Sequence, residues 1–100
     1  MADDSFDVVR NDHQHRYEAR IDGRVAGFVT YTSTPGHITL VHTEVDQAFE
    51  HLGIASRLIG ATLDDLRTQG VAVTPRCPFV AEYIRIHPEY ADLVEPGSAV

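Results

Sequence analysis

The first half of the chain alternates between hydrophobic and polar positions with a period of two. Such alternation is typical of half-buried β-strands. The pair Asp22-Gly23 is favoured in tight hairpin turns, and the loop-forming residues 33–36 indicate a second connection. We therefore expect four antiparallel strands in meander order. They cover residues 6–10, 16–21, 25–32 and 37–45.

The period changes to a helical one in the second half of the chain. One face of the expected helix carries Ile54, Leu58, Ile59, Leu63 and Leu66. Gly70 follows where a helix C-cap glycine belongs. Residues 71–73 then predict a short fifth strand, which Pro75 stops.

A second helix is expected from Pro78, because proline fits the first turn of a helix. Its apolar face carries Val80, Tyr83, Ile84 and His87. Pro88 ends this pattern, and residues 89–95 have room for one or two further turns. The prediction is a single α+β domain over residues 1–100, with five strands and two to three helices.

The composition is that of an ordinary folded domain, with 43% hydrophobic and 23% charged residues. Fifteen acidic residues against eight Lys and Arg give a formal net charge of −7. The sequence has no run of cations that could neutralise phosphates, and anionic lipid headgroups would repel an acidic chain. We therefore expect no nucleic-acid partner and no membrane partner.

The single cysteine, Cys77, excludes an internal disulfide framework and a multi-cysteine zinc site. Residues 1–5 are acidic where a signal peptide needs basic residues, and no stretch approaches the ~20 apolar residues of a spanning helix. These features favour the cytoplasm. The six histidines are scattered without metal-ligand spacing, so we expect no metal.

The segment 44–58 predicts a strand, a short loop and the start of an amphipathic helix. The first turn of a helix presents unpaired N–H groups and the positive end of the helix dipole, which suit an anion. Gly53, Ala55 and Ser56 are small enough for a phosphate to approach the backbone. Taken alone, a glycine before a helix is more often ordinary turn chemistry.

Four motifs in order resemble a known superfamily. They are His42-Thr43-Glu44-Val45, Gly53-Ile54-Ala55-Ser56-x-Leu58, Pro75-x-Cys77-Pro78-Phe79-Val80 and His87-Pro88-Glu89-Tyr90. Together they resemble the short single-domain branch of the Gcn5-related N-acetyltransferase superfamily, over about residues 16–94. The segment 50–55 corresponds to the superfamily signature Gln/Arg-x-x-Gly-x-Gly/Ala. It departs from that signature at Glu50, which places a negative charge near the expected pyrophosphate.

The resemblance implies an α+β fold with a mixed, mainly antiparallel five-stranded sheet and two to three helices. It also implies a small N-acetyltransferase that moves acetyl from acetyl-CoA, its co-substrate, to an amine. That amine is a small molecule or a protein lysine, and the enzyme is expected as a monomer or weak dimer. The resemblance also implies that acetyl-CoA contacts the end of the fourth strand and the loop that follows it. These contacts are Thr43, Glu44, Val45, His51, Leu52, Gly53, Ile54, Ala55, Ser56 and Arg57.

Three residues are candidates for catalysis. His42 is the natural general base near neutral pH, and Glu44 on the same strand face is the second candidate. Because Ile38 and Leu40 share that face in the alternation, a partly buried structural histidine is equally open. Cys77 could accept the acetyl group, with Arg76 favouring its thiolate, or it could be a small buried thiol.

Two other functions stay open on the sequence alone. The first is a non-catalytic module that binds CoA or acyl-CoA, which the acidic Glu50 and the lack of an unambiguous base favour. The second is a structural adaptor without a small ligand. The resemblance offers Tyr83 as an acid for the departing thiolate, but its spacing favours a helix contact instead.

Overall fold

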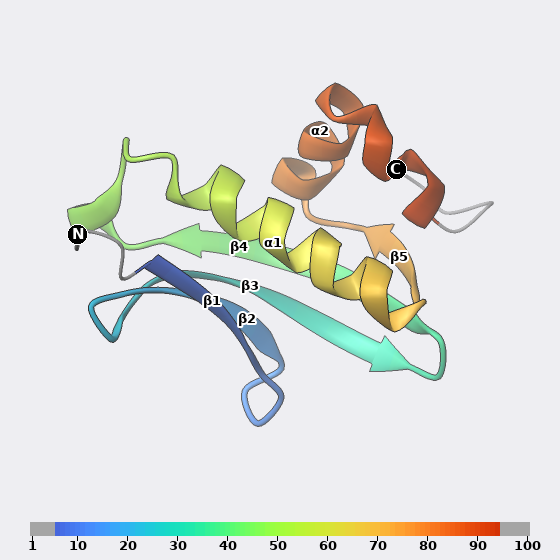
Figure 1. Cartoon of the computed structure of the whole chain (residues 1–100), viewed down its shortest axis with the longest axis horizontal. Coiled ribbons are helices and arrows are strands. Elements are labelled where there is room, and N and C mark those ends of the chain that lie inside the picture. Colours follow the sequence, from blue (N-terminus) through green and yellow to red (C-terminus); the bar gives the residue numbers. More distant parts are fainter. Residues whose placement is uncertain (1–5, 95–100) are drawn as a thin grey trace.

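The computed structural model describes residues 6–94 and contains one sheet with helices packed against it (Figure 1). Its elements are β1 (Phe6–Asn11), β2 (Arg16–Ile21), β3 (Arg24–Thr34), β4 (His37–Val45), η2 (Gln47–Phe49), α1 (Ile54–Gln69), β5 (Ala72–Pro75), α2 (Pro78–Ile86) and η3 (Pro88–Leu93). The five strands follow the chain order β1-β2-β3-β4-β5. β1 to β4 are antiparallel neighbours, and β5 joins β4 in parallel. The predicted α+β fold is confirmed.

The predicted bounds of β1, β3 and β5 are wrong by one or two residues. β3 continues to Thr34, because Ser33 and Thr34 pair with the start of β4, so the connection is confined to residues 35–36. β5 starts at Ala72 and includes Pro75. Proline is tolerated there because it is the last residue of an edge strand. No helix within residues 6–94 is long and apolar enough to cross a membrane.

The core lies between α1 and one face of the sheet, which α1 crosses in Figure 1. Side chains from both layers are fully buried there, including Leu58, Leu63, Tyr17, Val29 and Leu40. The opposite face of the sheet, which we call the open face, leaves Val25 and Val41 of β3 and β4 exposed. The sheet is therefore packed on one side only over the described residues.

An irregularity in β4 changes which face its residues occupy. Leu40 pairs with Tyr31, and His42 pairs with the preceding residue of β3, so Val41 is an extra residue in β4. Such a β-bulge re-aims the side chains that follow it. His42 is exposed on the open face, and the expectation that it shares the buried face of Ile38 and Leu40 is wrong.

Candidate functional site

The site begins where β4 loses its neighbour. β5 pairs with β4 only over residues 37–40, and the carbonyl of Leu40 accepts bonds from the N–H groups of Arg76 and Cys77, each at 3.0 Å. The chain then turns into α2. Within residues 6–94 no strand pairs with the outer edge of β4 from Val41 to Val45. This edge can form hydrogen bonds with an extended ligand.

The N-terminus of α1 lies next to the end of β4. Gly53 caps it with a left-handed backbone (φ 73°) and no side-chain hydrogen bond to the helix. A residue with a Cβ is strained in this conformation, which accounts for glycine here. The first N–H groups of the helix, from residue 54 to 56, have no partner within the helix. The N–H of Arg57 already bonds to the carbonyl of Gly53 at 3.2 Å.

A small cavity of about 200 Å³ connects these two features. It is lined by Val45, Phe49, Glu50, His51, Gly53, Ile54, Ala55, Ser56 and Phe79. Sequence analysis selected most of this lining, but it did not assign Phe79 a role. In the sequence, the signal for Phe79 was an aromatic residue directly after Pro78, which starts α2. In the structure its side chain is 40% exposed.

Two of the predicted binding residues lie elsewhere around the loop. Leu52 does not line the cavity, although its side chain is 60% exposed. The Arg57 guanidinium lies 3.7 Å from the centre of the Phe6 ring, in contact with β1. Glu50 does line the cavity, so a carboxylate is present where the resemblance places phosphate. Anion binding here therefore depends on the N–H groups of α1.

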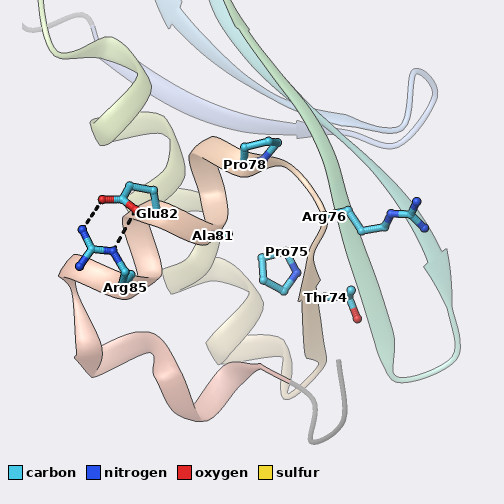
Figure 2. A pocket seen from close by; sticks show the side chains of 7 residues that line it. All are labelled: Thr74, Pro75, Arg76, Pro78, Ala81, Glu82 and Arg85. Carbon is cyan, nitrogen blue, oxygen red and sulfur yellow. Dashed lines mark hydrogen bonds and ion pairs between the residues drawn. The ribbon is translucent and has the colours of Figure 1, made fainter. Parts of the chain in front are cut away.

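Cys77 is buried on the helix-covered side of β4. It is 4% exposed, precedes Pro78 as the N-cap residue of α2, and its Sγ lies 3.3 Å from Oγ1 of Thr43. Sequence analysis had selected Thr43 only for its backbone. The neighbouring Arg76 is exposed and points away from α2 (Figure 2), so the structure gives no contact by which it would favour the Cys77 thiolate.

His42 and Glu44 meet on the open face. Nε2 of His42 lies 3.2 Å from Oε1 of Glu44, and the two side chains are 60% and 61% exposed. Their partners across the strand are Thr30 and Phe28, which lie on the same face. The three catalytic candidates are therefore divided between the two faces of β4, with the unpaired edge of the strand between them.

Tyr83 is a packing residue, as its spacing predicted. A Cβ on Gly60 would stand 2.8 Å from its hydroxyl oxygen, so the tyrosine fills the space left by this glycine of α1. The Tyr83 ring stacks on His87 with 4.0 Å between ring centres. Burial raises the pKa of Tyr83, helped by the charge of Asp64. These contacts fix α2 on α1.

A second cavity lies outside the candidate site. It has a volume of about 800 Å³ and lies between β5 and α2 (Figure 2). The cavity is lined by Thr74, Pro75, Arg76, Pro78, Ala81, Glu82 and Arg85. It contains the ion pair of Glu82 and Arg85 and does not include the N-terminus of α1. No group of three or more His, Cys, Asp or Glu side chains that could hold a metal ion occurs within residues 6–94.

Comparison with known proteins identifies the family of the chain. Residues 16–93 match the family described as GCN5-related N-acetyl-transferase. The chain belongs to the GCN5-related N-acetyltransferase family. This family uses acetyl-CoA as its co-substrate. No curated protein matches the chain.

Solved structures of N-acetyltransferases share the fold. A GCN5-like protein from Staphylococcus aureus is 14% identical, covers 95% of this chain and 91% of its own length, and has a TM-score of 0.64. The ribosomal-protein-S18-alanine N-acetyltransferase of Escherichia coli is 22% identical, with 74% of this chain covered and a TM-score of 0.56. The chain spans about half, 49%, of the length of that enzyme.

Proposed function

We propose that this protein transfers an acetyl group from acetyl-CoA to an amine, with donor and acceptor meeting at the unpaired edge of β4. The observation that carries the proposal is the position of this edge beside the N-terminus of α1. The edge offers backbone hydrogen bonds to an extended amide-containing arm. The helix offers N–H groups to phosphates. Family membership supports the same donor.

The residues around the cavity fit this donor. The small side chains of Ala55 and Ser56 allow close approach to the N–H groups of residues 54–56. Phe79 lines the cavity from α2 and supplies apolar contact area. Backbone groups of residues 43–45 would bond to the pantetheine arm, as the resemblance implies.

Direct transfer assigns distinct roles to His42 and Glu44. An amine must be neutral to attack the thioester carbonyl, so His42 would accept its proton while the C–N bond forms and the C–S bond breaks. Glu44, whose Oε1 lies 3.2 Å from Nε2 of His42, would orient the imidazole. A backbone N–H of β4 would polarise the thioester carbonyl.

The donor site is tested by titrating the protein with acetyl-CoA and with CoA while amide signals are followed by NMR. We expect shifts centred on residues 43–45 and 53–57. No shift at millimolar ligand would show that the fold has no CoA site, and the proposal would be wrong. Shifts with no consumption of acetyl-CoA across a broad amine panel would instead favour the binding module.

The base is tested by kinetics with an acceptor that supports turnover. His42→Gln should lower kcat by about 10²- to 10⁴-fold, the usual contribution of a general base. It should also remove the ionisation of this base from the pH profile of kcat/KM. Glu44→Gln should lower kcat less, because it removes only the orienting partner. His13→Gln, in the exposed turn before β2, is the matched control and should behave as wild type.

A second route is favoured by the position of Cys77 beside Thr43 at the same edge. The Cys77 thiolate would attack the acetyl carbonyl of acetyl-CoA and release CoA as a thiolate. The neutral amine would then attack the carbonyl of acetyl-Cys77, release the Cys77 thiolate and lose a proton to solvent. All eight basic residues of the chain are arginines, so no lysine can be self-acetylated. Hydroxylamine-sensitive acetyl on wild type, absent in Cys77→Ser, would support this route. Full activity of Cys77→Ser would exclude it.

A further inference from the structure

One arginine side chain of this protein has no partner among residues 6–94. The eight arginines all lie within residues 6–94, and seven have an ion pair or lie over an aromatic ring. These seven are Arg10, Arg16, Arg20, Arg24, Arg57, Arg67 and Arg85. Among the described residues the guanidinium of Arg76 contacts no carboxylate, hydroxyl or ring. Its backbone N–H lies 3.0 Å from the carbonyl oxygen of Leu40 and 3.1 Å from that of Thr74.

Arg76 points to the open face. Figure 2 shows Thr74 and Arg76 on one side of β5 and Pro75 on the other, toward α2. The Thr74 hydroxyl lies 2.6 Å from Nε2 of His37, so these two side chains share a face. Ile38, the next residue of β4, is buried in the core, and neighbouring strand residues point to opposite faces. Thr74 and His37 therefore lie on the open face. Arg76 therefore lies on the same face as His42 and Glu44.

It also stands at the point where the strands separate. Its N–H bonds to the carbonyl of Leu40, the last residue of β4 that pairs with β5. His42 is two residues farther along β4, about 7 Å at the usual rise per residue. The long guanidinium side chain can reach over this part of the strand. The side chain of Arg76 thus starts at the point where the edge of β4 becomes unpaired.

We propose that Arg76 binds an anionic group of the acceptor, which makes the acceptor an amine that also carries a carboxylate or a phosphate. This inference rests on the proposed function. The ammonium end faces the carboxylate of Glu44 and the imidazole of His42, and the anionic end faces Arg76. Guanidinium binds both anions through paired N–H donors. The overall charge of −7 acts at longer range and is screened beyond about 8 Å in physiological salt, so the local contact decides orientation.

The experiment compares amines that differ only in the anion. Alanine is paired with alaninamide, and phosphoethanolamine with ethanolamine, in wild type, Arg76→Gln and the control Arg85→Gln. For each protein kcat/KM is measured, together with calorimetric binding of the same amines to the CoA-saturated protein. Wild type and Arg85→Gln should prefer one anionic amine at least about tenfold. Arg76→Gln should lose this preference and keep its rate with the uncharged partner.

The ratio between variants cancels the different basicity of the paired amines. If Arg76→Gln loses the preference only in the alanine pair, the anionic group is a carboxylate. If it loses the preference only in the phosphoethanolamine pair, the group is a phosphate. A wild type without preference in either readout, or a preference that survives in Arg76→Gln, would overturn the inference. If CoA binds but no amine reacts, the proposed acetyl transfer is wrong. Calorimetric binding of the paired amines to the CoA-saturated protein then still tests whether Arg76 binds the anionic group. An unchanged melting temperature of Arg76→Gln confirms that the side chain has no structural role.

Discussion

Replacing Glu18 by Gln should destabilise this protein at neutral pH and have little effect in strong acid. Glu18 lies on the open face of β2 and is only 2% exposed. Its carboxylate accepts hydrogen bonds from Arg20 at 2.7 Å, Arg16 at 2.8 Å and Asn11 at 2.9 Å. A neutral amide of the same shape keeps the packing and loses the charge-assisted bonds.

The size of the effect follows from the pKa of Glu18. Burial opposes the charge, but the bonds from Arg20, Arg16 and Asn11 outweigh it and lower the pKa from 4.5 to about 2. A depression of this size corresponds to about 3 kcal/mol. Because the folded state holds the proton less tightly than the unfolded state, the stabilisation is complete above about pH 4.5. It is lost as the pH falls toward about 2.

The assay is urea unfolding of wild type and Glu18→Gln at several pH values between 7 and 2. The gap in the free energy of unfolding should be about 2–3 kcal/mol at pH 7, since the amide still accepts one bond. It should close between about pH 4.5 and 2. Glu82→Gln is the control, because Glu82 pairs with Arg85 in an exposed position on α2 and should leave stability unchanged. A gap that stays constant with pH would refute the ionic explanation.

Substitutions at two further positions test the packing. Thr62 is fully buried on α1 and its hydroxyl has no hydrogen-bond partner among the described residues, so Thr62→Val should raise the free energy of unfolding by about 1 kcal/mol. Thr62→Ala leaves a void and should lower the free energy of unfolding. A fall in the melting temperature of Thr62→Val, measured by calorimetry, would contradict this prediction. A Cβ on Gly27 would stand 2.8 Å from the carbonyl oxygen of Glu44, so Gly27→Ala should cost about 1–3 kcal/mol in unfolding experiments. The same variant should shift the amide signals of residues 43–45, and unchanged signals would show that β3 and β4 adapt elsewhere.

Local signals were enough to predict most of the fold. The turn at Asp22-Gly23 requires positive φ at both residues, and the structure has 52° and 80° there. The glycine at residue 70 ends α1 in a left-handed conformation, as its position predicted. These features depend on a few neighbouring residues, so they are visible in the sequence. The parallel pairing of β5 with β4 depends on the whole crossover through α1. A mixed sheet was therefore predicted only from the family resemblance.

The faces of the strands were less predictable, because they depend on register. Val41 is an ordinary β-branched residue in an alternating stretch, and nothing marks it as the extra residue of a bulge. Glu18 occupies the polar side of the alternation, yet it is buried because Arg16 and Arg20, two residues away on either side, fold over it. Here the sequence did contain a signal, since two cations flank one acid on the same strand face.

The bulge and the short β5 together decide what the candidate site can do. β5 stops pairing at Leu40, and the bulge at Val41 reverses the faces of β4 just where its edge becomes free. Thr43 then turns toward Cys77, while His42 turns to the open face. A thiol and an imidazole on opposite faces cannot hand a proton to each other directly, so the direct and covalent routes are alternatives rather than steps of one relay. His42→Gln should therefore leave any acetylation of Cys77 intact, and loss of both together would show that β4 rearranges when acetyl-CoA binds.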